Sequence, residues 1–185
     1  EGHVAPVRAA RQALGLDRVI YLPTARPPHK PGRRMAPALS RFAMVEMALL
    51  GEEGLYASPF ELTLGRPAYT IDTLEYFTAQ EPNAELVLLI GSDSFLELES
   101  WVRWQEIPQL AHLGVLSRPG AEVERERLSP LLSQLLDQGR ATLLAERTVD
   151  LSSTRLREIL RTGGEPPAGT VSPLVLDYAR KYGLY

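Results

Sequence analysis

Short apolar runs alternate along the chain with longer stretches in which apolar residues recur at the helical period. Strands are expected at residues 18–23, 55–60, 86–90, 113–116 and 142–145. Helices are expected at residues 6–14, 39–49, 70–77, 124–138, 153–162 and 172–182. Such alternation is typical of βαβ units around a mostly parallel sheet, so the pattern predicts an α/β fold.

Two of the expected strands run directly into segments that we expect to be polar, glycine-containing loops. Leu86–Ile90, the clearest buried strand, is followed by Gly91–Ser94, and Leu113–Leu116 is followed by Ser117–Gly120. Ligands of open parallel sheets bind beyond the carboxyl ends of the strands. Both segments are therefore candidates for a ligand site, although this placement does not identify the ligand.

Composition narrows the class of protein. The 185 residues predict a single domain over 1–185, and no apolar run approaches the roughly 20 residues that span a bilayer. The net charge of −3 argues against a nucleic-acid partner, and the absence of cysteine excludes disulfides. We expect a soluble, cytoplasmic protein without a membrane partner. Because the chain begins at Glu1 rather than Met, we also expect a native N-terminal strand upstream.

The segment Ser152–Arg157 carries the strongest chemical signal. Ser152 is placed to cap the helix that follows, and Arg155 falls in its first turn, where the helix dipole disfavours a cation. A bound anion reverses that sign, because free N–H groups, hydroxyls and guanidinium groups together form a polyphosphate cradle. The alternative is an ordinary capped surface helix with solvated arginines.

Other segments are weaker candidates. The basic loop 26–34 contains Lys30 and follows a strand, so it either closes over phosphates or is a solvated loop. Gly91 with Asp93 suits close approach of a nucleotide and hydrogen bonds to ribose, but a helix cap is the simpler interpretation. Trp101 and Trp104 are spaced for packing on an amphipathic helix, unless one of them stacks on a flat ring.

Two familiar phosphate-binding motifs, G-x-G-x-x-G and the P-loop, are missing from the sequence. The three histidines are scattered and no H-E-x-x-H occurs, so no dedicated metal site is predicted. Other short motifs occur in order: Gly2-His3, Pro27–Lys30, Tyr69–Leu74, Ile90–Ser94, Trp101, Arg118–Gly120, Ser152–Arg157 and Tyr182–Tyr185. Taken together over the whole chain, they resemble bacterial nicotinate-nucleotide adenylyltransferase.

The resemblance implies a three-layer Rossmann-like nucleotidyltransferase fold, with a mostly parallel sheet flanked by helices. It implies that ATP and nicotinate mononucleotide are the partners, and that nicotinate adenine dinucleotide and pyrophosphate are the products, a step of NAD biosynthesis. Mg²⁺ would arrive with ATP, without dedicated protein ligands. Homo-oligomerisation is left open.

Site residues follow from the same resemblance. It assigns ATP binding to Gly2, His3, Gly91, Asp93, Arg118, Ser152, Ser153, Thr154 and Arg157. It assigns the acceptor nucleotide to Lys30, Thr70, Asp93 and Trp101. The catalytic roles fall to His3, Lys30 and Arg157.

Two departures from the family pattern stand out. The glycine-rich opening strand and the first histidine of the H-x-G-H element are missing before Gly2-His3, and Val102 replaces a frequent aromatic residue. Within the same superfamily, pantetheine-phosphate adenylyltransferase is the alternative, although the Tyr69–Leu74 and Trp101 segments fit it less well. A non-catalytic nucleotide-binding module is the alternative from another class.

Overall fold

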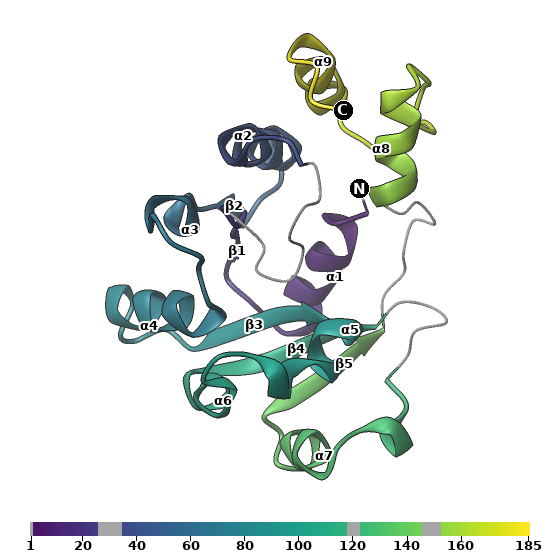
Figure 1. Cartoon of the computed structure of the whole chain (residues 1–185). Coiled ribbons are helices and arrows are strands. Elements are labelled where there is room, and N and C mark those ends of the chain that lie inside the picture. The colour runs from purple at the N-terminus through teal and green to yellow at the C-terminus, as the bar shows by residue number, and fades with distance from the viewer. Residues whose placement is uncertain (1, 26–34, 118–122, 146–152) are drawn as a thin grey trace. The chain divides into compact units, whose positions relative to one another are not determined.

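The computed structural model describes residues 2–25, 35–117, 123–145 and 153–185 (Figure 1). The chain divides into two compact units, one formed by residues 1–67 with 148–185 and the other by residues 68–147. Each unit contains a parallel sheet and an apolar core of its own. The α/β class with parallel strands and flanking helices is confirmed, whereas the single domain over 1–185 stays a prediction.

The sheet of the first unit has two strands. Strands β1 (Val19–Tyr21) and β2 (Leu55–Ala57) pair in parallel, with Tyr21 opposite Ala57. Both strands lie where the sequence predicts them, but the second ends three residues early. Pro59 has no N–H to donate to a ladder, and Phe60 begins a short helix, so the prediction of a strand to residue 60 was wrong.

Helices make up most of the remainder of the first unit. They are α1 (Ala5–Ala13), α2 (Ala38–Leu49), α3 (Phe60–Thr63), α8 (Ser153–Arg161) and α9 (Pro173–Lys181). Gly15 adopts a φ of 63° just after α1, and the N–H of Leu16 donates to the carbonyl of Arg11 at 2.9 Å. Glycine at this position ends the helix without steric cost, as the sequence predicts.

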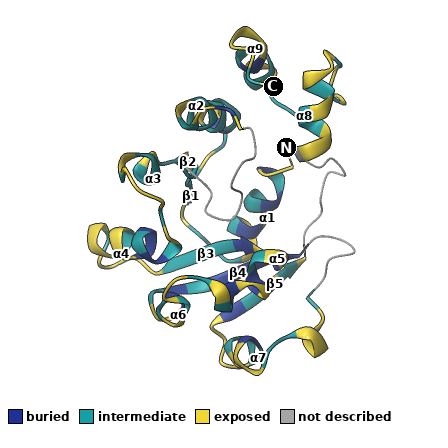
Figure 2. Ribbon diagram, viewed as in Figure 1, coloured by how far each residue is buried: buried dark blue, intermediate teal, exposed yellow. Residues whose placement is uncertain are grey.

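The second unit is built on three parallel strands in the order β3–β4–β5. Their bounds are Leu86–Gly91, Ala111–Ser117 and Ala141–Ala145. Strand β4 is buried along most of its length, which fits its nearly continuous apolar sequence and its central position. Figure 2 shows buried positions on these strands and on α4 (Thr70–Gln80).

Short helices surround this second sheet. They are α4, α5 (Ser92–Leu96), the 3₁₀ helices η1 (Leu98–Ser100) and η2 (Trp104–Glu106), α6 (Ile107–Leu110), the 3₁₀ helix η3 (Arg125–Arg127) and α7 (Pro130–Asp137). Ser129 caps α7 by accepting a hydrogen bond from the N–H of Leu132 at 3.2 Å. The stretch 124–138, expected to be helical as a whole, is thus split in two.

Candidate active site

The first unit contains the Gly2-His3 motif in a turn that leads into α1. The residue flanking this helix is Val4, which makes no side-chain cap, and the first turn of α1 has no acidic side chain. The first N–H groups of such a helix start therefore remain suited to an anion. The place of Gly2 and His3 at the ATP phosphates stays a prediction.

Tyr21 fixes the backbone of this turn. Its hydroxyl donates a hydrogen bond to the carbonyl oxygen of His3, with 2.9 Å between the two oxygens. Burial raises the pKa of Tyr21 above its ordinary value, and the carboxylate of Glu52 raises it further, while Arg8 opposes both. Tyr21 therefore stays protonated near neutral pH and remains a hydrogen-bond donor to His3.

An ion pair lies next to Tyr21. Arg8 donates from Nε to Oε2 of Glu52 at 2.9 Å and from Nη2 to the other carboxylate oxygen. These hydrogen bonds hold the pKa of Glu52 below its usual value. The pair joins α1 to the segment before β2, so it contributes to the support beneath the His3 turn.

The predicted phosphate cradle lies at the start of α8. The helix begins at Ser153 as expected, and Thr154 and Arg155 are exposed in its first turn. Ser152 lies outside the described residues, as does the loop with Lys30. The structure therefore gives the start of the helix, while the phosphate cradle itself stays a prediction.

Arg157 on α8 is not a fully exposed arginine. It is half-buried and lines an apolar cavity of about 170 Å³ in the first unit. The other lining residues are Met44, Leu156, Leu160, Val171, Val175, Leu176, Ala179 and Tyr185. Apolar surface around an arginine stem allows the guanidinium to extend from a fixed base.

Arg41 on α2 was not predicted from the sequence. Its Nε donates to the carbonyl of Ala36 at 3.2 Å, and its Nη2 donates to the carbonyls of Thr24 and Ala25. Burial lowers the pKa of Arg41 from its ordinary value. Arg41 thus joins residues 24 and 25 to residue 36, which flank the segment that contains Lys30.

The second unit brings two predicted residues to one edge of its sheet. Gly91 ends β3 and pairs with Leu116 of β4, while Asp93 is exposed in α5, which follows at once. The segment with Arg118 comes directly after β4, but Arg118 lies outside the described residues. The expectation of a loop at Gly91–Ser94 was wrong, because Ser92 begins a helix without an intervening turn.

Gly91 has open space where a side chain would be. A Cβ built there has no atom of the described residues within 4 Å beyond its chain neighbours, and the residue has an extended backbone with a φ of −74°. Neither packing against the described residues nor backbone conformation requires glycine at this position. The predicted close approach of a nucleotide supplies a reason for it.

Thr70 and Trp101 are the predicted contacts of the nicotinate moiety. Thr70 is the first residue of α4, not its cap, since Tyr69 flanks the helix and its N–H donates to Asp72 at 3.1 Å. Trp101 lies in a turn between η1 and η2, so the amphipathic helix expected for Trp101 and Trp104 was wrong. Both tryptophans pack against the core of the second unit.

The predicted site residues thus divide between the two units. Gly2, His3, Thr154 and Arg157 belong to the first, and Thr70, Gly91, Asp93 and Trp101 belong to the second. Among the described residues, no group of three or more His, Asp or Glu side chains is arranged to hold a metal ion. No described helix is long and apolar enough to cross a membrane.

Comparison with known proteins defines the class to which this chain belongs. The cytidylyltransferase-like family matches residues 1–159, so the chain belongs to this group of nucleotidyltransferases. A protein of Aeromonas hydrophila named "Probable nicotinate-nucleotide adenylyltransferase" is 40% identical over all of this chain and 90% of its own length. One of the same name from Gloeobacter violaceus is 34% identical over all of this chain and 89% of its own. The chain belongs to the nicotinate-nucleotide adenylyltransferase family.

Solved structures agree with the fold. The nicotinic acid mononucleotide adenylyltransferase of Plasmodium falciparum, complexed with NaAD, has a TM-score of 0.73 at 15% identity. The similarity covers 98% of this chain and 90% of that one. At this identity the likeness concerns the fold, and it confirms the Rossmann-like nucleotidyltransferase expectation.

Proposed function

We propose that this chain transfers the adenylyl group of ATP to nicotinate mononucleotide, giving nicotinate adenine dinucleotide and pyrophosphate in NAD biosynthesis. The observation that carries the proposal is the end-to-end match to relatives bearing that enzyme name. The local structure supports it, because the His3 turn, the start of α8 and the Gly91 edge each have the form that a nucleotide phosphate or ribose requires.

The chemistry needs little from a general base. A phosphate monoester has a second pKa of about 6, so the phosphate of the acceptor is already largely ionised at neutral pH. One of its oxygens forms a bond to the α-phosphorus of ATP as the bond to the pyrophosphate oxygen breaks. The protein then contributes positioning and stabilisation of negative charge.

His3, Lys30 and Arg157 are the groups we propose for this stabilisation. Tyr21 holds the backbone of His3, and Arg41 joins residues that flank the segment with Lys30. Mg²⁺ belongs to the substrate as Mg·ATP and neutralises part of the triphosphate charge. The cytoplasm, which supplies ATP, is the proposed location.

The deciding experiment measures pyrophosphate release from ATP with three acceptors: nicotinate mononucleotide, nicotinamide mononucleotide and phosphopantetheine. We expect the highest kcat/KM with nicotinate mononucleotide. A preference for phosphopantetheine would overturn the proposal, and tight nucleotide binding by calorimetry without turnover would favour a non-catalytic module.

A further inference from the structure

Arg103 has a backbone conformation that arginine rarely adopts. Its φ is 53° and its ψ is 36°, and it is the one non-glycine residue with a positive φ in the part of the chain that the structure describes. The left-handed region is disfavoured for residues that carry a Cβ. Such a conformation persists only where the surrounding structure maintains it.

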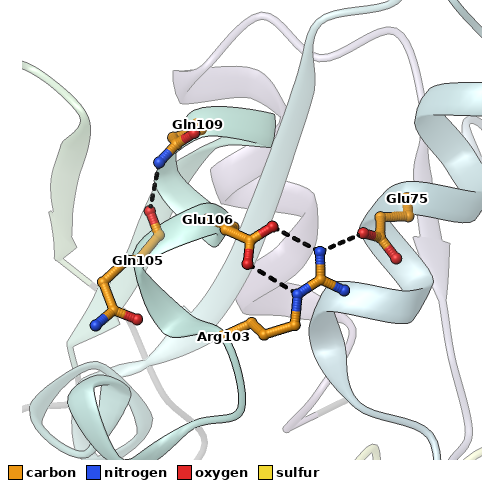
Figure 3. Close-up of polar contacts among 5 residues, drawn as sticks. All are labelled: Glu75, Arg103, Gln105, Glu106 and Gln109. Atoms are coloured by element: carbon orange, nitrogen blue, oxygen red, sulfur yellow. Dashed lines mark hydrogen bonds and ion pairs between the residues drawn. The ribbon is translucent and has the colours of Figure 1, made fainter.

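The side chain of Arg103 makes ion pairs to two carboxylates. Arg103 donates from Nε to Oε1 of Glu106 at 2.8 Å and from Nη2 to Oε2 of Glu106 at 2.6 Å (Figure 3). Its Nη2 also donates to Oε1 of Glu75 at 2.6 Å. In Figure 3 the guanidinium lies between the two carboxylates, one from α4 and the other from η2.

This network is an inefficient way to stabilise the fold. The side chains of Arg103 and Glu75 are 44% and 46% exposed, and exposed ion pairs contribute little to the free energy of unfolding. Glycine at position 103 would adopt the same backbone without strain. What arginine adds is a fixed geometry, because its planar fork binds two carboxylates in set directions.

The ion pairs of Arg103 connect two elements that contain predicted substrate contacts. Arg103 lies in the turn that Trp101 opens, and this turn is closed by a hydrogen bond from the N–H of Trp104 to the carbonyl of Trp101 at 3.2 Å. Glu75 lies on α4, the helix that begins at Thr70. The arginine thus connects the Trp101 turn to the Thr70 helix within one compact unit.

We propose that Arg103, held by Glu75 and Glu106, is a positioning residue that sets Trp101 relative to Thr70 for the ring of the acceptor nucleotide. The inference rests on the proposed function and on the predicted contacts of Thr70 and Trp101 with that ring. Arg103 acts through Trp101 and does not touch the substrate. Removing the Arg103–Glu75 ion pair should weaken binding of the acceptor nucleotide and leave binding of ATP unchanged.

Glu75→Gln is the mildest test, since it keeps the shape of the side chain and the Glu106 pair. We expect KM for nicotinate mononucleotide to rise about fivefold or more, with KM for ATP unchanged. Arg103→Gly, which keeps the backbone preference, should give at least as large a rise. Asp137→Asn is the matched control, because it removes a similar exposed ion pair, Arg125 to Asp137 at 2.9 Å, in the same unit.

The double variant separates a coupled network from two independent effects. If the arginine and Glu75 act together, Glu75→Gln combined with Arg103→Gly raises KM no further than Arg103→Gly does. Additive increases in the double variant, or an unchanged acceptor KM in Glu75→Gln, would overturn the proposal.

Fluorescence gives a second measurement that does not depend on turnover. The chain has two tryptophans, so Trp104→Phe leaves Trp101 as the sole indole reporter. In that background we expect Glu75→Gln to shift the Trp101 emission to longer wavelength and Asp137→Asn to leave it unchanged. An unchanged spectrum in Glu75→Gln contradicts the positioning role. Absence of turnover with every acceptor, by contrast, would defeat the proposed function while this spectrum still decides the role of Arg103.

Discussion

Tyr21 and His3, eighteen residues apart in the chain, are joined by a hydrogen bond from the tyrosine hydroxyl to the histidine carbonyl at 2.9 Å. Tyr21 ends strand β1, so the strand determines where the turn before α1 lies. The bond acts on the backbone of His3 and leaves its imidazole to other contacts. Support of this kind affects catalysis only if the imidazole or the N–H groups of the turn meet the substrate.

Tyr21→Phe should therefore reduce activity as well as stability. Loss of one hydrogen bond to a carbonyl costs about 0.5–1.5 kcal/mol of unfolding free energy. If the His3 turn binds the triphosphate, kcat/KM for ATP should fall roughly tenfold, since misplaced phosphate contacts are lost in the transition state. Steady-state kinetics and urea unfolding of the same preparation check both parts.

Tyr56→Phe provides the control for this change. Tyr56 lies on the neighbouring strand β2, and the residue is 57% exposed. It should leave kcat/KM for ATP at the level of the parent protein. Equal losses in the two variants would show that any change in this small sheet disturbs the enzyme, and the Tyr21–His3 bond would have no particular role.

Gly91→Ala tests the nucleotide edge of the second sheet. Because the added Cβ meets no atom of the described residues within 4 Å beyond its chain neighbours and the backbone is extended, the folded protein should accept alanine. Replacing glycine at a compatible position stabilises a protein by about 0.4–1 kcal/mol through the unfolded state. We expect an equal or higher melting temperature together with KM for ATP raised about tenfold or more, because the methyl group occupies space that the nucleotide needs.

Calorimetry with a non-hydrolysable ATP analogue separates binding from turnover in this variant. An unchanged analogue affinity would show that the nucleotide does not approach Gly91. A falling melting temperature would show instead that the glycine serves the fold.

The sequence alone was sufficient to predict those strands and helices whose hydrophobic pattern lies within the element itself. Strand β4 is a nearly continuous apolar run, and α8 and α9 have clear helical periods, so their positions were predicted within about two residues. The same holds for glycine stops such as Gly15. Predicting the α/β class therefore required no long-range information.

Features that depend on distant partners could not be predicted. The spacing of Trp101 and Trp104 indicates a helix, but Arg103 takes a left-handed conformation that the carboxylate of Glu75, 28 residues away, helps to hold. Likewise, nothing near Arg41 in the sequence shows that it binds the carbonyl of Thr24. Candidate residues came from motif order, whereas the residues that support them emerged only from the fold.

Glu52 should give the protein an acid-dependent component of stability. Its hydrogen bonds with Arg8 lower its pKa in the folded state, so the unfolded chain binds a proton more readily. This stabilisation is fully present above the ordinary glutamate pKa of about 4.3 and is lost as the pH falls through the lower folded value. Urea unfolding between about pH 3 and pH 7 should show the decline.

Glu52→Gln should remove this part of the pH dependence. At pH 7 the variant should be less stable by on the order of 1 kcal/mol, since the carboxylate is 22% exposed and its pair is only partly screened by water. Near pH 3 the difference from the parent should shrink. If the difference in unfolding free energy between the parent and Glu52→Gln stayed constant over the whole pH range, the contribution of the Arg8–Glu52 pair would not depend on the charge of Glu52.

Arg157→Met separates the guanidinium of the predicted phosphate contact from its apolar stem. Arg157 is half-buried and lines the cavity between α2, α8 and α9, so alanine would remove packing as well as charge. Methionine keeps most of that volume, and the free energy of unfolding should change by less than about 1 kcal/mol. If the guanidinium holds the triphosphate, kcat/KM for ATP should fall about a hundredfold, as expected for a charge-assisted contact made in the transition state.

Arg161→Met is the control on the same helix, because Arg161 is exposed and paired with Glu158 at 2.6 Å, and it should retain full activity. If Arg157→Met loses stability and kcat/KM in equal measure, Arg157 belongs to the packing of the cavity and the cradle must be built from other residues.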